Sequence, residues 1–453
     1  MSRTRSMVVT LLIAATVLVA CGKSGGGSST TTTSTTAKAP VVLTDSFRGV
    51  TATSIKIGFA IVDFNCAKQF INFVRPNQQG VYQAFVDNVN NHGGIGGRKI
   101  DPVYKAFCPI TAGPALDACS SFTQDSKVFA IIGNIGVNSA DALLCASRDH
   151  QTVTIGHEFG QSTIAQAPPG LLITPDITAE RRTNVLLNLL KSQNTLAGKK
   201  VAIIGDQNTK VRADTVITPG LTALGVAQGS TAILTVTGTD TSSAQSQLDS
   251  FIEKWKGENV TALFMTGLVV SSKQFVEKVK AGMPNVLLMA DGESGTKDGA
   301  QNEVAAHKSP NPYEGALTAI GDTAAETWHR SDVQNCAQIA DTALNLNVLG
   351  PDVAKPGPDG NTDQTYQAVE DFCQEIDMFK QIAEKAGPNL TNQTWADAVN
   401  NFGSIKLIGN PFGSLHTSKY DADDGFRLAS FDSTIPPTGD WKPLTPLQDT
   451  SKG

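Results

Sequence analysis

The sequence is poor in charge, in histidine and in long apolar runs, and each shortage narrows the class of protein. Only 17% of the residues are charged, the formal net charge is −6, and the basic residues form no runs. Nucleic acid is therefore not an expected partner, because nucleic-acid-binding domains cluster basic side chains. The six histidines are scattered, without a pair at ligand spacing on one helix, which predicts no metal site.

Signatures of catalysis are missing as well. The segment Gly292-Glu293-Ser294-Gly295 is not a nucleophile elbow, since that motif needs a central serine in Gly-x-Ser-x-Gly directly after a strand. No nucleophile–base constellation stands out, and no cofactor is predicted. The apolar content of 40% indicates a soluble globular protein. We therefore expect a binding protein rather than an enzyme.

The apolar run at the start of the chain, Met7 to Val19, is shorter than the roughly 20 residues that a membrane span needs. Arg3 and Arg5 precede it, so residues 1–20 are predicted to be a secretory signal peptide. Leu-Val-Ala-Cys, ending at Cys21, resembles a bacterial lipobox, which implies cleavage before Cys21 and lipidation of its sulfur. The alternative is an ordinary signal peptide with an incidental cysteine. Lipidation would hold the protein on the extracytoplasmic side of the cell membrane.

A tether follows the predicted lipidation site. Residues 22–39 are almost entirely Gly, Ser and Thr, and such a segment cannot bury enough apolar surface to fold. We assign residues 21–43 to this tether. With 453 residues, the whole chain has room for two domains beyond it.

The first folded stretch predicts a βαβ unit. Ser54 to Ile61 alternates and then becomes continuously apolar, as a buried strand does. Val81, Ala84, Phe85 and Val89 recur at helical spacing, and residues 98–107 read as a second strand. A parallel sheet follows from this order, with its loops open at the carboxyl ends of the strands.

The same alternation of strands and helices continues along the chain, which predicts an α/β fold with two lobes. Further strands are predicted at residues 128–133, 152–156, 199–205, 260–265 and 286–290, with a returning strand at 315–320. Further helices are predicted at residues 115–126, 246–256, 272–281, 336–346 and 365–386, and a hairpin at 413–431.

These motifs together resemble a known family. The opening strand, the Gly-Gly-Ile-x-Gly-Arg turn at residues 93–98 and the strand ending at Gly133 are similar to those of type I periplasmic binding proteins, above all the leucine/isoleucine/valine-binding branch. The resemblance implies two Rossmann-like lobes with flavodoxin-like parallel sheets, joined by three crossovers. It places residues 44–175 and 313–405 in lobe I, and residues 176–312 and 406–445 in lobe II. It also implies a small-molecule ligand between the lobes and, as partners, an ABC permease and its ATPase.

Six cysteines lie beyond the tether, and an exported chain with an even number favours disulfides over buried free thiols. In the implied fold the first two strands are neighbours, and Cys66 and Cys108 lie just past their ends. Two helices flank the third strand, and Cys119 and Cys145 lie on them. Some relatives pair cysteines near Cys336 and Cys373. Pairing in this order is one of fifteen ways to connect six cysteines.

The resemblance also locates a ligand site at the carboxyl ends of the strands, where open α/β sheets bind ligands. In relatives that bind amino acids, hydroxyls and backbone amides hold the carboxylate, and an acidic residue of the second lobe holds the ammonium. A cationic or donor-rich ligand group is accordingly expected at Asp291 or Glu293. The candidates are Asp63, Asn65, Asn138, Ser139, His157, Glu158 and Phe159 from lobe I, and Asp206, Leu268, Asp291 and Glu293 from lobe II.

The sequence departs from the amino-acid binders at two of these positions. Residues 156–159 replace small hydroxyl residues, and Leu268 replaces a common aromatic, so amino acids, amides and related polar compounds all remain candidate ligands. For each single residue the alternative is a solvated loop or a cap. For the whole chain, the alternatives to an importer's binding protein are a ligand sensor with a membrane signalling partner, and an exported hydrolase.

Overall fold

The computed structural model describes residues 42–67, 73–137, 139–157, 159–235, 242–267, 270, 272–292, 296, 299–301, 303–304, 309–351, 353, 362–436 and 439–451. The chain divides into the segment Met1–Val42 and one compact unit, Leu43–Gly453. The predicted signal peptide, Cys21 and the tether up to residue 41 lie outside the described residues. Among the helices within the described residues, none is both long and apolar enough to span a membrane.

The first lobe is built on a five-stranded parallel sheet in the order β3-β1-β4-β5-β6. Its two long strands are paired along their whole length, with Ser54 opposite Lys99. This order, in which the second strand lies outside the first, is the flavodoxin-like order and confirms the predicted parallel βαβ unit. The strands are β1 (Ser54–Val62), β3 (Lys99–Phe107), β4 (Ala130–Ile132), β5 (Val153–Ile155) and β6 (Leu172–Ile173).

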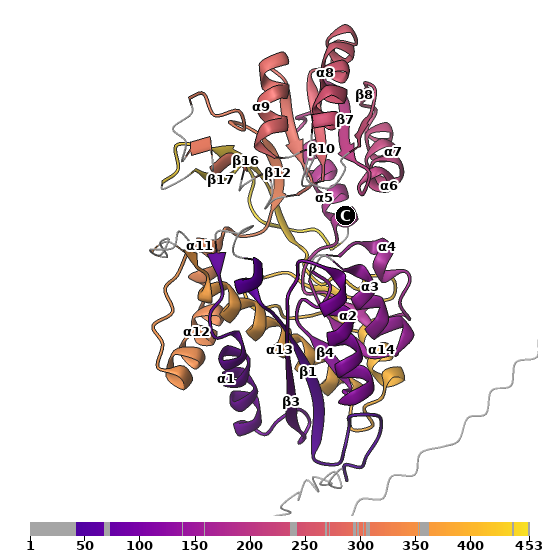
Figure 1. Ribbon diagram of the computed structural model, residues 1–453, viewed down its shortest axis with the longest axis vertical. Helices are drawn as coiled ribbons and strands as arrows, with labels where there is room; N and C mark the ends of the chain where they lie inside the picture. The colour runs from indigo at the N-terminus through magenta and orange to yellow at the C-terminus, as the bar shows by residue number, and fades with distance from the viewer. Residues whose placement is uncertain are drawn as a thin grey trace, which may run out of the picture. The chain divides into compact units, whose positions relative to one another are not determined.

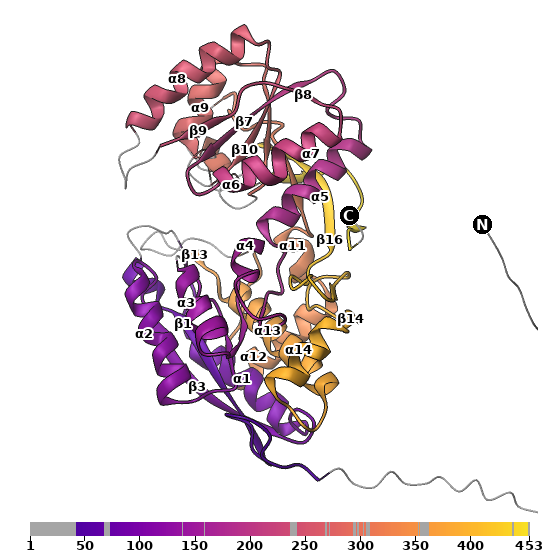
Figure 2. The same cartoon turned by 90° about the vertical axis from the view of Figure 1, so that its right-hand side faces the viewer.

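Helices from both ends of the folded chain cover this sheet. Figure 2 shows α2 and α3 on one side of it and α12, α13 and α14 on the other. Trp395 of α14 is fully buried, stacks on Phe379 of α13 and donates to the carbonyl of Gly170 at 3.0 Å. The helices are α1 (Gln78–Asn91), α2 (Ala112–Ser120), α3 (Ala140–Leu144), α4 (Gln161–Ile164), α12 (Ser331–Leu344), α13 (Thr365–Ala386) and α14 (Asn392–Asn400).

The second lobe contains a nine-stranded sheet whose main path is β17-β16-β12-β11-β10-β7-β8. Strands β7 to β12 are parallel, and β16 and β17 add antiparallel pairs at one edge. Its strands are β7 (Lys200–Asp206), β8 (Ala227–Gln228), β9 (Ala232–Leu234), β10 (Ala262–Thr266), β11 (Leu287–Ala290), β12 (Leu317–Ile320), β16 (Gly425–Asp432), β17 (Asp440–Pro443) and β18 (Gln448–Asp449).

Two predicted lobe boundaries are wrong. Residues 406–445 were assigned to lobe II, but Leu407, Leu415 and Ala422 pack in the first-lobe core, so the last crossing to the second lobe comes after Ala422. The pairing of β12 corrects the other boundary. Residues 313–405 were assigned to lobe I, but β12 pairs with β11 and β16 in the second sheet. All four β12 residues are buried there, so the chain returns to the first lobe only after Ile320. The predicted hairpin at 413–431 is also only partly regular, because its long arm is β16, which pairs with β12 and β17.

The helices of the second lobe, drawn in the upper part of Figure 1, lie on both faces of its sheet, as Figure 2 shows for α9 and α7. The helix α5 packs on β12 and β16, and its leucines, such as Leu186 and Leu190, are buried. The helices are α5 (Ala179–Ser192), α6 (Lys210–Arg212), α7 (Thr218–Ala223), α8 (Ser242–Gly257) and α9 (Lys273–Gly282).

Short elements lie between these. The strand β2 (Phe73–Val74) pairs with β13 (Thr362–Asp363), and β14 (Gly403–Ser404) pairs with β15 (Ser414–Leu415). The helix α11 (Ala324–Trp328) has a capping box between Thr323 and Glu326. Single π-helical turns follow α2, α3 and α6, at Ser121–Asp125, Cys145–Asp149 and Ala213–Ile217.

The chain crosses between the two lobes three times. Ile173, Trp328 and Ala422 belong to the first-lobe core. Their near neighbours in sequence, Ile177, Ile320 and Phe426, belong to the second-lobe cores. The predicted fold class, two α/β lobes joined by three crossovers, is therefore confirmed.

All three predicted disulfides are present. Cys66–Cys108 links the segments that follow β1 and β3, Cys119–Cys145 links α2 to the turn after α3, and Cys336–Cys373 links α12 to α13. All three lie within lobe I.

Candidate functional site

The predicted site residues that the structure describes follow the carboxyl ends of strands in both lobes, as the topology requires. Four further candidates lie outside the described residues, namely Asn138, Glu158, Leu268 and Glu293. For the other seven, the structure shows which polar groups are already bonded within the protein and which are exposed to a ligand.

Two of the first-lobe candidates are engaged in local caps. Oδ1 of Asp63 accepts from the backbone amide of Asn65 at 3.0 Å, so Asp63 opens the short turn after β1, and the Asn65 side chain is exposed. Oγ of Ser139 accepts from the amide of Ala142 at 3.4 Å and caps α3. Capping by serine or aspartate satisfies backbone donors that the helix leaves unpaired, so these two residues shape the loops of the site.

Phe159 lies deeper than the sequence suggests. Its ring is 9% exposed and belongs to the first-lobe core. It therefore anchors the loop after β5 in the first-lobe core, and its contact with a ligand stays a prediction.

His157, at the end of β5, is the centre of a buried polar network. Its Nδ1 lies 2.9 Å from Oδ2 of Asp176, in the first crossover. Its Nε2 lies 2.6 Å from Oε1 of Glu375 on α13. Oε2 of the same glutamate accepts from the hydroxyl of Tyr82 on α1 at 2.6 Å. One imidazole thus ties the β5 loop to a crossover and to two helices.

The charges of this network follow from burial and pairing. Burial lowers the pKa of His157, but the adjacent Asp176 and Glu375 carboxylates outweigh burial and raise that pKa well above its usual 6.5. Burial raises the pKa of Glu375, and its bonds to His157 and Tyr82 partly offset this. Because both imidazole nitrogens face carboxylate oxygens, the protonated ring, which has two donors, fits the geometry.

We expect His157 to stay protonated at neutral pH and to lose its stabilising effect as the pH rises. A histidine whose folded pKa exceeds its unfolded value contributes fully below about pH 6.5, and the contribution disappears as the pH passes the folded pKa. An NMR titration of the imidazole resonances measures this, with His157→Gln identifying the signal. A midpoint at or below 6.5 would contradict the assigned network.

Further carboxyl groups surround the network. Burial raises the pKa of Glu370 to about 8, and the neighbouring Asp371 and Asp176 act in the same direction. Arg75 pairs with Asp371 at 2.8 Å and lies over the ring of Phe64. The first-lobe side is therefore rich in acidic groups, with Arg75 and His157 as cations among them.

The second-lobe candidates are Asp206 and Asp291. Oδ1 of Asp206 accepts from the amides of Asn208 and Thr209 at 3.0 and 3.1 Å and so caps the turn after β7. Oδ2 of Asp291 accepts from the hydroxyls of Thr266 and Thr183 at 2.7 and 3.1 Å.

Arg212 forms an ion pair with Asp291. Nε of Arg212 lies 3.0 Å from Oδ2 of Asp291 and also donates to the Thr266 hydroxyl at 3.0 Å. Burial raises the pKa of Asp291, and Arg212 opposes this increase. The sequence interpretation assigned the cation at Asp291 to the ligand, whereas the chain itself supplies one.

The residues that sequence reasoning missed are Tyr82, Glu375, Asp176 and Arg212. For Glu375 a signal exists in the sequence. In α13 the buried positions include Phe372, Ile376 and Phe379, and Glu375 is a carboxylate within this apolar stripe, which is unusual unless the charge has a partner. Arg212 follows β7 in a short helix and has no comparable signal.

Comparisons with known proteins bear on the fold. No protein-family model and no curated protein matches the chain in sequence. A solute-binding protein of an ABC transporter from Rhodopseudomonas palustris BisB5, in complex with 3,4-dihydroxybenzoic acid, is 13% identical, with a TM-score of 0.57 over 88% of this chain and 98% of that chain.

Two other solved structures give the same result. The leucine-binding protein LivK from Thermotoga maritima MSB8 is 11% identical, with a TM-score of 0.56 over 86% of this chain and 97% of that chain. A fatty acid ABC transporter substrate-binding protein from Thermomonospora curvata is 14% identical, with a TM-score of 0.58 over 90% and 95%. These neighbours are transport proteins that bind substrates. The chain therefore has the two-lobed fold of the type I periplasmic solute-binding proteins.

Proposed function

We propose that this protein is the solute-binding component of an ABC importer. It would capture a small polar molecule between its lobes and present it to a membrane permease driven by an ATPase. The observation that carries the proposal is the pair of polar clusters at the strand ends, one in each lobe of a fold that solute-binding proteins share. Two lobes joined by crossovers close on a ligand only if it contacts both, since only differential contacts favour the closed state.

The clusters favour a polar ligand with both donors and acceptors, such as an amino acid, an amide or a related compound. On the first lobe, Asp176 is 39% exposed beside His157 and offers carboxylate oxygens. On the second, Arg212 is 18% exposed beside Asp291 and offers guanidinium donors, which suit a carboxylate or another planar acceptor.

The ligand can be identified from the protein itself. Native mass spectrometry of gently purified protein would show the bound mass, and release of that molecule would allow calorimetry. A protein that carries no small molecule and binds none from a panel of amino acids, amides and aromatic acids would contradict the proposal.

Once the ligand is known, Arg212→Ala is expected to weaken binding about 10- to 100-fold. A hydrogen bond to a charged group contributes about 1.5–3 kcal/mol, which corresponds to that range. Titration calorimetry measures the change, and Arg148→Ala is a matched control because Arg148 pairs with Asp149 on the surface of the first lobe. Equal affinity in both variants and the parent protein would place the ligand away from Arg212.

The membrane anchor is part of the same proposal and rests on the Leu-Val-Ala-Cys motif and the tether behind it. We expect Cys21→Ala to move the protein from the membrane fraction to the soluble fraction, because the variant lacks the sulfur that carries the lipid. Fractionation followed by immunoblotting measures this. If parent and variant are both soluble, the anchor is wrong while the binding function is untouched.

A further inference from the structure

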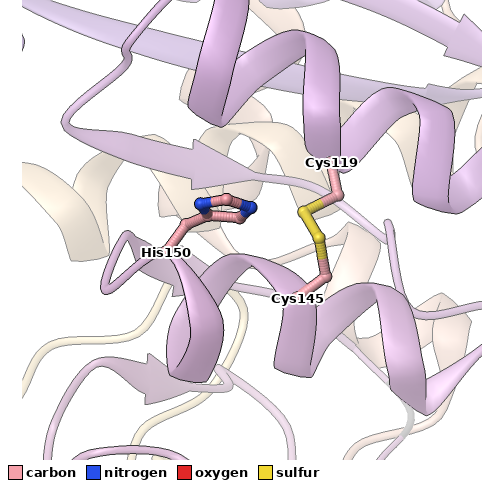
Figure 3. Close-up of side chains that lie close together, drawn as sticks. All are labelled: Cys119, Cys145 and His150. Atoms are coloured by element: carbon pink, nitrogen blue, oxygen red, sulfur yellow. A yellow bond between two sulfur atoms is a disulfide. The ribbon is translucent and has the colours of Figure 1, made fainter.

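One cluster of metal-ligating side chains lies outside the candidate site. Within the described residues, only one group of three His, Cys, Asp or Glu side chains brings its ligand atoms together, and it consists of Cys119, Cys145 and His150. Their sulfur and nitrogen atoms all lie within 4.8 Å of one another. Figure 3 shows the disulfide between the two cysteines, with one ring nitrogen of His150 turned toward it.

We propose that reduction of this disulfide creates a zinc site made of the two cysteine thiolates and His150. Two thiolates and an imidazole are a ligand set that Zn²⁺ uses in proteins, with a fourth position left for water or another donor. While the sulfurs are joined they are not thiolates, and the thiolate is the form that binds a metal. The site therefore exists only in the reduced protein.

The backbone that holds the three ligands does not depend on the sulfur–sulfur bond. The Cys145 carbonyl accepts from the amide of His150 at 3.0 Å, and the Cys119 carbonyl accepts from the hydroxyl of Thr123 at 2.8 Å. The His150 carbonyl accepts from Arg48 at 3.0 Å. The helix α2 also packs on α3 and on the turn after it, and Ala118 and Ala146, next to the two cysteines, are fully buried in the first-lobe core. Because this packing remains after reduction, we expect the Cα atoms of the two cysteines to stay near their 6.4 Å separation, so that rotation of the side chains opens room for an ion.

Local structure and access also fit a metal. Each cysteine adjoins a π-helical turn, at Ser121–Asp125 and at Cys145–Asp149, and such turns are frequent at functional sites. A surface cavity of about 330 Å³, lined in part by Arg48 and His150, gives an ion a path to the ring.

The proposed site forms in two steps, reduction of the disulfide and binding of the metal. A dithiol reductant supplies two electrons and two protons, converts the disulfide to two thiols and becomes a cyclic disulfide. Binding of one Zn²⁺ to the two thiols and the neutral imidazole then releases two protons. Affinity should therefore increase with pH until the thiols are ionised.

Cobalt titration of the reduced protein tests the site, because Co²⁺ occupies zinc sites and its thiolate complexes absorb in the near ultraviolet. We expect one Co²⁺ per reduced chain, displacement by Zn²⁺, and no thiolate band in the oxidised protein. The thiolate band should be lost in Cys119→Ser/Cys145→Ser. It should be kept in the control Cys336→Ser/Cys373→Ser, which also lacks one disulfide but keeps all three proposed ligands. His150→Ala should weaken zinc binding on the order of 100-fold, since it removes one of three ligands.

Thermal unfolding of the reduced protein gives a second readout that does not depend on the absorption band of the cobalt complex. Zn²⁺ should raise the melting temperature of the reduced parent chain, because a ligand that binds the folded form stabilises it. It should raise that of Cys119→Ser/Cys145→Ser little, if at all. Equal cobalt binding in the two double variants, or an equal rise in melting temperature, would overturn the proposal.

Discussion

Arg181→Ala is expected to lower the free energy of unfolding by about 3–5 kcal/mol, the usual cost of removing one partner from a buried ion pair. Nε of Arg181 donates to Oδ2 of Asp421 at 2.9 Å, and Nη1 donates to Oδ1 of Asp424 at 3.0 Å. A third donor, Nη2, bonds the carbonyl of Asp423. Both carboxylates are buried, at 0% and 1% side-chain exposure.

The size of this effect follows from what the variant leaves behind. Without Arg181, Lys419 is the cation that remains beside the two carboxylates, 3.1 Å from Asp424 and 3.8 Å from Asp421. Nζ of that lysine already donates to the carbonyls of Ser414 and Asp421 at 2.7 and 2.5 Å, so it cannot replace the three bonds of the guanidinium. Guanidinium denaturation, followed by circular dichroism, measures the shift of the unfolding midpoint.

Arg148→Ala is the control for this measurement. Arg148 pairs with Asp149 at 2.7 Å, but both side chains are about half exposed, and exposed pairs contribute little. A shift for Arg181→Ala no larger than that of the control would mean that the crossover pair does not stabilise the fold.

Glu375→Ala is expected to have an effect of similar size, about 3–5 kcal/mol. Glu375 is 1% exposed and accepts hydrogen bonds from Tyr82 and His157, which lie 293 and 218 positions away in sequence. Its removal leaves a buried hydroxyl without its acceptor and a protonated imidazole with Asp176 as its carboxylate partner. The same denaturation experiment measures the loss, and the His157 titration should show a lower pKa.

Two variants bracket this prediction. Glu375→Gln keeps an acceptor for the Tyr82 hydroxyl and should lose less stability than Glu375→Ala. Glu384→Ala, on the same helix, removes a partly exposed pair with Lys380 and should cost at most about 0.5 kcal/mol. If Glu375→Ala lowered the free energy of unfolding no more than Glu384→Ala does, the buried network would not stabilise the fold.

The order of strands and helices could be predicted because it depends on local periodicity. The helix predicted at residues 365–386 is α13, Thr365–Ala386, and the strand predicted at 54–61 is β1, Ser54–Val62. Both segments carry an apolar pattern of the right period along most of their length. The disulfides Cys66–Cys108 and Cys119–Cys145 were predictable because the implied fold puts each pair on neighbouring elements, whereas Cys336–Cys373 followed from the resemblance to relatives that pair cysteines in that region.

The details of the site were harder to predict because they depend on contacts between distant segments. Asp291 could be placed at a strand end, but nothing in the sequence near it indicates that Arg212 would lie 3.0 Å away. His157 was identified as a candidate, whereas its partners Asp176 and Glu375 come from a crossover and from the far side of the lobe. Sequence spacing likewise gave no sign of the zinc site, because two of its ligands are cysteines hidden in a disulfide.

The three crossovers also have a consequence for how the chain is made. The first sheet is complete in sequence once β6 has been synthesised, but its covering helices α12, α13 and α14 come after the second lobe has begun. That lobe in turn needs β16, near the chain's end, to pair with β12. Neither lobe is a continuous stretch of sequence, so a nascent chain cannot complete the first lobe until most of the second has been synthesised. Truncation anywhere before Ala422 removes part of both lobes, and neither lobe can be produced alone by simply shortening the gene.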